Sequence, residues 1–324
     1  MTSDPLVSAV IPTHNYGEYV CAAVQSALAQ TYPNLEVIVV DDGSTDDTRE
    51  RLRVFGDKIT YIYQDNKCVA SARNTGVRAA RGDWIAFLDS DDTWAKRKVE
   101  LQMTAARMHG WQVVLCADPG ARTAAAGPRE VELSFEELLF ARPGFGSCAL
   151  VLKKCFDDVG LFDEWLTNAE DRDIMLRLGR RFKTGLLYED CVHIRKHARQ
   201  KSYHAARMER SHRRVVQKVS SWPEMRHRYA LKARMRSCFY WDSGYNYFAQ
   251  GDRWRALGRT LLSLAHYPLP TGRTFVREPL GRLKLALRLV AGDKVFMWLR
   301  GRLPPKARRS STDPVGGEVH GSGD

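Results

Sequence analysis

Short apolar runs alternate with longer amphipathic stretches along the first third of the chain. The runs, rich in Val, Ile and aromatic residues, are typical of buried strands and cover 7–12, 35–41, 59–63 and 84–88. The stretches between them have the composition or apolar spacing of helices and cover 16–30, 45–55, 69–80 and 94–109. Asn15 is the candidate cap of the first helix. Strands that alternate with helices predict an α/β fold, with a mainly parallel sheet and helices on both faces.

The pattern changes in the second part of the chain. Periodicity is weak from about Pro119 to Pro143, which predicts a loop region with one short helix. Beyond His204 the chain is expected to be helical. The elements predicted in this part are a helix at 134–140, a strand at 147–153, a turn at 160–163, a helix at 170–178 and amphipathic helices at 253–265 and 280–289.

Charge divides the chain more sharply than its net value of +12 indicates. Residues 1–171 hold 17 Lys and Arg against 26 Asp and Glu, whereas residues 172–324 hold 33 against 12. Such a basic half is either a solvated helical bundle, or a surface that binds an anionic membrane or a nucleic acid, and no recognisable binding module supports the nucleic acid. We predict an α/β domain at 1–203, a basic helical region at 204–309 and a disordered tail at 310–324.

Composition and cysteine usage narrow the class of protein. No apolar run reaches the roughly 18 residues of a spanning helix, and no basic and apolar leader opens the chain. The seven cysteines are odd in number and form no C-x-x-C pair, which argues against a disulfide framework or zinc knuckle. The expected location is therefore cytoplasmic, either free or peripheral at the inner face of the cell membrane.

Polar clusters follow three of the predicted strands, at residues 12–16, 41–44 and 89–92. Ligands of open α/β sheets bind at the carboxyl ends of the strands, so these clusters are expected to converge on one crevice. The adjacent carboxylates of Asp89, Asp91 and Asp92 repel one another and predict a compensating divalent cation, Mg²⁺ or Mn²⁺, shared with a substrate diphosphate. The alternative is an Asp-rich turn that caps the following helix.

The second cluster, with Asp41 and Asp42, also allows two interpretations. It is either a turn built on Gly43, or a site where a carboxylate accepts a hydrogen bond from a nucleotide base. The chain contains no P-loop, and no G-x-G-x-x-G follows the first strand. A Walker-type ATPase and a Rossmann dinucleotide enzyme are therefore disfavoured.

Four segments together resemble the family 2 glycosyltransferases, in order and in spacing. They are V-I-P-T-H-N at 10–15, V-V-D-D-G-S-T-D at 39–46, S-A-R-N-T-G at 71–76 and F-L-D-S-D-D at 87–92. The resemblance is dense over 7–100 and looser to about Ser202. It implies a glycosyltransferase-A fold and a nucleotide-sugar donor.

The resemblance implies a role for individual residues. Thr13 and Asp42 would contact the base, with Pro12, Asn15, Tyr16 and Asp41 around it. Arg73, Asn74, Asp89 and Asp91 would lie near the ribose and sugar. Asp92 would hold the metal, assisted by Asp91 and by His197, which follows His193 at a spacing of four. A histidine pair at this spacing also occurs on ordinary surfaces.

Inverting transfer needs a base that takes the proton of the acceptor hydroxyl. Asn168 to Asp173, at a predicted helix start, resembles the family's E-D motif, and we expect Asp171 to be the base with Glu170 as a supporting carboxylate. The alternative is that these acids stabilise the helix N-terminus through its dipole. Residues 145–148 resemble the segment that lines the acceptor side.

The hypothesis from the sequence is transfer of a sugar from a nucleoside diphosphate sugar, expected to be UDP-linked, to an acceptor hydroxyl with inversion. The acceptor would be a saccharide or a lipid-linked precursor in the synthesis of cell-surface polysaccharide or glycolipid. One alternative is a sugar nucleotidyltransferase, whose Gly-rich loop after the first strand is missing here. Another is a non-catalytic protein that binds nucleotides or membranes.

Overall fold

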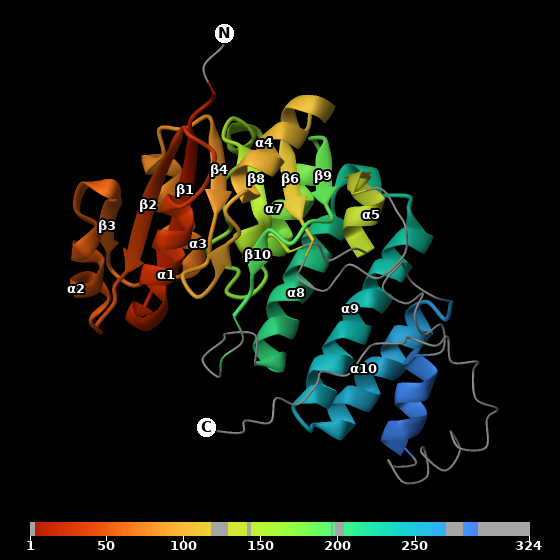
Figure 1. The fold of residues 1–324 in the computed structure, drawn as a ribbon. Helices are drawn as coiled ribbons and strands as arrows, with labels where there is room; N and C mark the ends of the chain where they lie inside the picture. Colours follow the sequence, from red (N-terminus) through yellow and green to blue (C-terminus); the bar gives the residue numbers. More distant parts are fainter. Residues whose placement is uncertain are drawn as a thin grey trace, which may run out of the picture.

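The computed structural model describes residues 4–117, 129–140, 144–195, 197, 204–269 and 281–290. A sheet with helices packed against it forms the N-terminal part, and the C-terminal helices lie beside it (Figure 1). The main sheet has the order β3-β2-β1-β4-β8-β6-β9-β7. Its strands are β1 (Val7–Thr13), β2 (Leu35–Asp42), β3 (Thr60–Gln64), β4 (Trp84–Phe87), β6 (Val113–Cys116), β7 (Glu130–Leu133), β8 (Ala149–Leu152) and β9 (Thr184–Leu187).

The first four strands are parallel, as the apolar runs predict. β1 lies between β2 and β4 and pairs with both in parallel, and β3 pairs with β2. β8 is antiparallel to β4 and β6, β9 is parallel to β6, and β7 is antiparallel to β9. A separate antiparallel pair joins β5 (Thr93–Trp94) to β10 (Val192–His193).

Three strands of the main sheet depart from the sequence prediction, as do the short strands β5 and β10. β7 lies in the stretch expected to be a loop region, and neither β6 nor β9 was predicted. β6 and β9 have four residues each and every one is buried, so they show no alternation of polar and apolar positions. The helix expected from residue 94 begins only at Lys98, because Trp94 belongs to β5.

Helices cover both faces of the sheet. They are α1 (Gly17–Leu28), α2 (Thr48–Leu52), α3 (Val69–Ala79), α4 (Lys98–His109), α5 (Phe135–Phe140), α6 (Cys155–Val159), α7 (Glu170–Gly179), α8 (Ala205–Ser220), α9 (Tyr229–Ala249) and α10 (Arg253–His266). Three 3₁₀ segments are η1 (Arg53–Lys58), η2 (Gly146–Cys148) and η4 (Pro223–Met225). Residues 281–290 form a further helix, and 310–324 lie outside the described residues.

The first helix does not begin as predicted. Its N-cap is Tyr16, not Asn15, and no side chain caps it. Asn15 has a positive φ of 56°, and its Oδ1 accepts hydrogen bonds from the backbone N–H groups of Thr45 (2.7 Å) and Asp46 (3.2 Å). Asp46 in turn accepts from the N–H of Gly17 at 3.2 Å. Asn15 therefore ties the turn after β2 to the start of α1.

Two hydrophobic clusters sandwich the sheet, because side chains alternate between its faces. On β1, Val10 points to one cluster, whereas Ala9 and Ile11 point to the other. The first cluster also holds residues of α3 and α7, and the second holds residues of α1 and α4. Four residues beyond 204 belong to the first cluster: Val215, Val219, Met225 and Met235. The C-terminal helices thus share a core with the sheet, while the boundary at 203/204 stays a prediction.

Candidate active site

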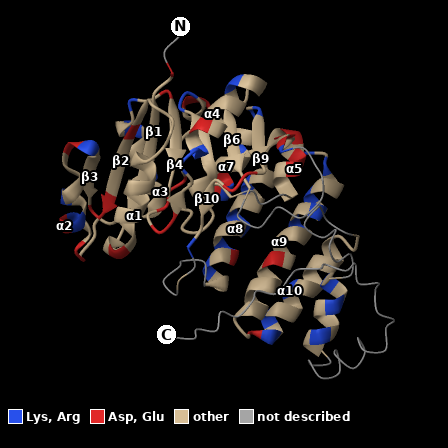
Figure 2. Cartoon of the chain, viewed as in Figure 1, with Lys and Arg blue, Asp and Glu red and all other residues tan. Residues whose placement is uncertain are grey.

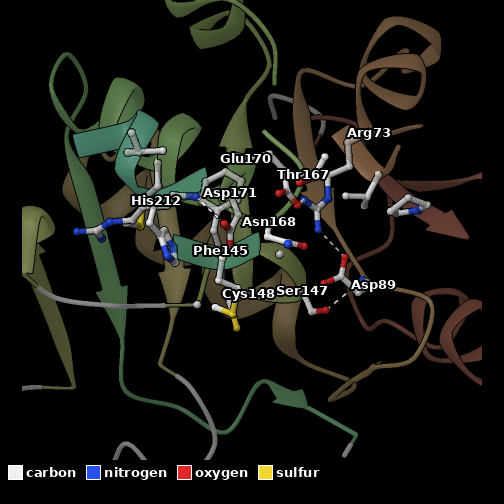
Figure 3. Close-up of a pocket in the computed structure, with 18 of the residues that line it drawn as sticks. Arg73, Asp89, Phe145, Ser147, Cys148, Thr167, Asn168, Glu170, Asp171 and His212 are labelled. Carbon is white, nitrogen blue, oxygen red and sulfur yellow. Dashed lines mark hydrogen bonds and ion pairs between the residues drawn. The ribbon is translucent and has the colours of Figure 1, made fainter. Parts of the chain in front are cut away.

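The polar ends of β1, β2 and β4 line one pocket of about 570 Å³. Because the three strands are parallel neighbours, their carboxyl ends meet at one edge of the sheet. Predicted site residues that line this pocket are Pro12, Thr13, Tyr16, Asp42, Arg73, Asp89, Asp91, Asp92, Glu170 and Asp171. Figure 3 shows Arg73 and Asp89 on one side and His212 on the other, with Asn168, Glu170 and Asp171 between them.

The β1–β2 end of the pocket offers one unused hydroxyl and one fixed carboxylate. Thr13 is 3% exposed, and among the described residues its Oγ1 has no hydrogen-bond partner. Asp42 is held in place, since its Oδ1 accepts from Gln64 Nε2 at 2.7 Å and from the N–H of Lys67 at 3.0 Å. A buried hydroxyl without a partner is costly, so this end is suited to a polar ligand.

Four predicted site residues are not among those that line the pocket: His197, which contacts Asp91 from outside the lining, and the three residues Asn15, Asp41 and Asn74. Asp41 is fully buried and accepts from the Tyr61 hydroxyl at 2.7 Å and the Ser44 N–H at 2.9 Å. Asn74 donates from Nδ2 to the Phe162 carbonyl (3.0 Å) and accepts from the Phe162 N–H (2.9 Å). The structure places these side chains where they hold the surrounding loops together.

Each carboxylate after β4 has a different partner. Asp89 accepts from Arg73 Nη2 at 2.7 Å, and Asp91 contacts His197 Nε2 at 3.0 Å. Asp92 accepts from the Ser147 hydroxyl at 2.5 Å and from the Arg195 N–H at 3.1 Å. Burial, followed by the charge of Asp89, raises the pKa of Asp91 and raises that of Asp92 to about 7. The cluster is therefore short of positive charge.

A divalent cation suits these carboxylates only if a ligand completes its coordination. Within the described part of the chain, no group of three or more His, Cys, Asp and Glu side chains is arranged to hold a metal ion. Mg²⁺ and Mn²⁺ are, however, commonly bound by one or two carboxylates together with substrate phosphates. The buried, charge-deficient carboxylates fit that mode. His197 points Nε2 at Asp91, and its buried Nδ1 has no partner among the described residues.

Arg73 joins the acidic cluster to α7. Its guanidinium is buried and bonds Asp89 at 2.7 Å and Glu170 at 3.1 Å. Burial lowers the pKa of Arg73, but the two carboxylates outweigh burial and the net pKa is raised. An arginine that is charged at every physiological pH thus spans the pocket floor and fixes both acids. Sequence alone places Arg73 on a helix and does not reveal this bridge.

The candidate base lies at the first turn of α7. Asp171 lines the pocket, and its Oδ1 accepts from the N–H of Arg172 at 2.7 Å. Glu170 beside it is 7% exposed, and its Oε2 has no partner among the described residues. Burial and the charge of Asp171 raise the pKa of Glu170 to about 7, against the opposing effect of Arg73. The more accessible Asp171 is the carboxylate that a substrate can reach.

The remaining wall of the pocket comes from α8 and α9, which sequence reasoning missed. Their contribution is mostly apolar and consists of Met208, His212, Val215, Val216, Val219, Met235, Cys238, Phe239 and Asp242. On α8 these positions recur every three or four residues, as on one face of a helix. That spacing was a usable signal, but it does not distinguish a core face from a pocket wall.

A mixed sheet with a pocket across the ends of its parallel strands, where carboxylates gather, is the arrangement of the glycosyltransferase-A fold. The fold prediction is confirmed by solved structures. S. aureus TarS 1-349 in complex with UDP-GlcNAc aligns with a TM-score of 0.65 at 17% identity, covering 91% of this chain and 92% of that chain. A mannosyltransferase from Pyrobaculum calidifontis, in complex with GDP-Man and Mn²⁺, gives 0.54 at 19%, covering 89% and 88%.

The family follows from sequence. Residues 8–131 match the model of glycosyl transferase family 2, and the predicted resemblance is confirmed. An uncharacterized glycosyltransferase of Rickettsia prowazekii is 32% identical over 60% of this chain and 65% of its own length. The UDP-Glc:alpha-D-GlcNAc-diphosphoundecaprenol beta-1,3-glucosyltransferase WfaP of Escherichia coli is 43% identical over 30% and 40%. The chain therefore spans less than two-thirds of the curated relatives it matches.

No helix within the described ranges is long and apolar enough to cross a membrane.

Proposed function

We propose that the protein transfers a sugar from a nucleoside diphosphate sugar, with UDP as the nucleotide, to an acceptor hydroxyl with inversion at the anomeric carbon. The observation that carries the proposal is that Thr13, Asp92 and Asp171 line the same pocket. A polar end for a nucleotide, a carboxylate cluster for a diphosphate and a reachable base are the three requirements of this reaction. The UDP-GlcNAc complex of the similar S. aureus TarS supports the choice of nucleotide.

In the proposed reaction, the acceptor oxygen attacks the anomeric carbon from the face opposite the diphosphate. A new C–O bond forms as the bond between the anomeric carbon and the diphosphate oxygen breaks, and the electron pair leaves with the diphosphate. Asp171 takes the hydroxyl proton on its carboxylate. Glu170 pairs with Arg73 and so holds the start of α7 in position. The same guanidinium also pairs with Asp89.

Asp92 and Asp91 would hold Mn²⁺ or Mg²⁺, with His197 as a further candidate ligand. When bound, the cation would stabilise the negative charge that develops on the leaving diphosphate. The carboxylates near one another, with their raised pKa values, support this assignment, as does the Mn²⁺ complex of the similar mannosyltransferase.

We propose a lipid-linked or saccharide acceptor, in the synthesis of cell-surface polysaccharide or glycolipid, and peripheral association with an anionic membrane. The apolar wall from α8 and α9, with Met208, Met235 and Phe239, supports an acceptor that carries an apolar part. The printed activity of the similar WfaP names a diphosphoundecaprenol-linked acceptor.

Release of nucleoside diphosphate from a panel of UDP-, GDP- and dTDP-sugars, with Mn²⁺ or Mg²⁺, tests the proposal. Many transferases hydrolyse their donor slowly without acceptor, so the acceptor need not be known. We expect release from one donor, its loss with chelator and in Asp92→Ala, and a fall of about 10²–10⁴-fold in Asp171→Asn. Asp57→Asn, the same change on an exposed aspartate in η1, is the control.

Two results would contradict the proposal. Nucleotide binding without release from any donor, unaltered in Asp171→Asn, would favour the non-catalytic alternative. Formation of a nucleotide sugar from a sugar phosphate and a nucleoside triphosphate, with release of pyrophosphate, would favour the sugar nucleotidyltransferase.

A further inference from the structure

A second hollow, of about 500 Å³, lies among the C-terminal helices α8, α9 and α10. Five arginines and a single carboxylate line it. The lining consists of Ala206, Glu209, Arg210, Arg213, Arg214, Gln217, Tyr247, Arg255 and Arg259, and we call it the arginine hollow. Basic residues mark these helices in Figure 2. The sequence reveals the basic region but not that its charges converge in space.

The one carboxylate of the arginine hollow organises the arginines without neutralising them. Glu209 is 5% exposed and accepts from Arg213 at 2.8 Å, Arg259 at 2.7 Å and the Tyr247 hydroxyl at 2.8 Å. Its hydrogen bonds fix two guanidiniums but cancel only one positive charge. Charges of one sign held together in a concavity attract a counter-ion of the opposite sign.

The other three arginines of the arginine hollow carry little compensation. Arg210 is exposed and forms no ion pair with any of the described residues. Arg214 donates to a neutral group, the Trp165 carbonyl, at 3.1 Å. Arg255 pairs with Asp252 at 3.4 Å on the solvent side of the N-terminus of α10. Guanidiniums present several donors in a planar fork, which suits the oxygens of a phosphate group.

Helix α10, which contributes Arg255 and Arg259 to the arginine hollow, also carries exposed apolar side chains. Trp254 is 83% exposed, Leu261 51% and Leu262 38%, and they share the helix with Arg255 and Arg259. Tryptophan and leucine on one face of a helix, beside arginines, are typical of helices that lie in the interface of a membrane. A soluble phosphate compound would gain nothing from these side chains, whereas a lipid headgroup has acyl chains next to it.

We propose that the arginine hollow binds the phosphate headgroup of an anionic phospholipid, with Trp254 and the leucines of α10 entering the lipid surface. The charge of the hollow and the exposed apolar side chains of α10 select this occupant. The headgroup site rests on the proposed function only for its purpose, which is to hold the active site near the membrane. Helix α8 forms a wall of both concavities: Met208 and His212 line the active-site pocket, and Arg210 and Arg213 line the hollow. Headgroup binding would keep that pocket within about one helix diameter, ~10 Å, of the membrane surface.

Vesicle flotation of the full chain tests the proposal. The vesicles are phosphatidylcholine alone, or an equal mixture of phosphatidylcholine and phosphatidylglycerol. The variant is the double change Arg210→Glu and Arg214→Glu, and the control is Arg49→Glu with Arg53→Glu. Both pairs are exposed arginines four residues apart on a helical segment, so the net charge changes equally. We expect the wild type and the control to bind mixed vesicles, and the hollow variant to bind at least tenfold less.

Further arms make each outcome decisive. Trp254→Ala, at an exposed position that the fold does not need, should also weaken binding to mixed vesicles. Equal losses in the hollow variant and the control would overturn the proposal, because general charge would then explain binding. Binding to inorganic phosphate or pyrophosphate that the hollow variant loses, without vesicle binding, would assign a soluble anion and equally overturn it.

Donor hydrolysis measured without vesicles separates this proposal from the proposed function. The hollow variant should release nucleoside diphosphate at the wild-type rate, which also shows that it is folded. Hydrolysis with no vesicle binding would overturn the headgroup site alone. Vesicle binding that depends on the hollow, with no hydrolysis in the wild type, would overturn the transferase alone.

Discussion

At the scale of single residues, the site holds several acidic side chains and few positive charges to pair with them. Arg73 is the buried cation between Asp89 and Glu170. Beyond it, burial and the negative charges of Asp89 and Asp91 raise the pKa of Asp92. The pKa of Glu170, like that of Asp92, is raised to about 7; at Glu170, burial and the charge of Asp171 outweigh Arg73. The protonation of Glu170 should therefore be visible in the pH dependence of folding.

We predict that Glu170→Gln alters how stability depends on pH. The pKa of Glu170 is about 7 in the folded protein, above its value of 4.5 in an unfolded chain. Between these values the folded state binds more protons, so the contribution of Glu170 to stability falls as pH rises from 4.5 to 7. The wild type should lose up to about 3 kcal/mol relative to Glu170→Gln over this range. Urea unfolding of both proteins at several pH values measures the difference, and parallel curves would contradict it.

The site residues that could be predicted from the sequence are those at the end of a strand, because the strand determines where their side chains lie. Thr13 and Asp42 are the last residues of β1 and β2, and Asp92 lies in the turn that follows β4, so the parallel order of the strands brings them to one pocket. Asn15 and Asn74 lie in equally polar segments but face the loops. The direction of a side chain in a turn depends on backbone angles, such as the positive φ of Asn15, that composition does not encode.

At the scale of elements, α3 approaches β1 closely because Gly76 has no side chain. A Cβ atom at Gly76 would lie 2.3 Å from Val10 Cγ1 in the core. This close packing positions α3, and with it Arg73, over the end of the sheet. Any side chain at this position would separate the helix from the strand.

We predict that Gly76→Ala destabilises the protein by about 1–3 kcal/mol, as overpacking does. Gly258→Ala on α10 is the matched control, because no atom lies within 4 Å of a Cβ there. Alanine has the higher helix propensity, so the control should gain up to about 1 kcal/mol. Thermal unfolding of the two variants gives both signs. A stable Gly76→Ala would show that α3 can shift without cost.

Elements were predictable in proportion to their length and pattern. β1 and β2, with seven and eight residues, stand out as apolar runs, and their boundaries agree within a residue or two. β6, β7 and β9 have four residues each, which is too few to reveal a period. β7 also carries two glutamates, one of which accepts from the Trp111 indole, a pairing between distant segments.

At the scale of the whole molecule, the C-terminal helices complete the core as well as the pocket. Val215 and Val219 of α8 and Met235 of α9 are buried in the cluster that contains Val10 and Phe87 of the sheet. The charge asymmetry of the two halves suggests a separate region, whereas packing unites them.

We predict that a fragment of residues 1–203 is much less stable than the full chain, because it exposes this apolar face to water. A fragment of residues 1–290 keeps α8, α9 and α10 together with the helix at 281–290, whose Leu285 and Leu289 are buried against them, and should unfold near the temperature of the full chain. Thermal unfolding and gel filtration of the two fragments compare them. A monomeric 1–203 fragment with an unchanged unfolding temperature would establish an independent N-terminal domain.

Helix α8 imposes a constraint on how this protein can diverge. One of its faces meets the active-site pocket and the opposite face meets the arginine hollow, with residues such as Met208 and Arg210 only two positions apart. A change that tilts or rotates the helix to admit a different acceptor would also move the guanidiniums. Acceptor range and the surface on which the protein works would then be inherited together, so that exchanging α8 to α10 between relatives should transfer both traits or neither.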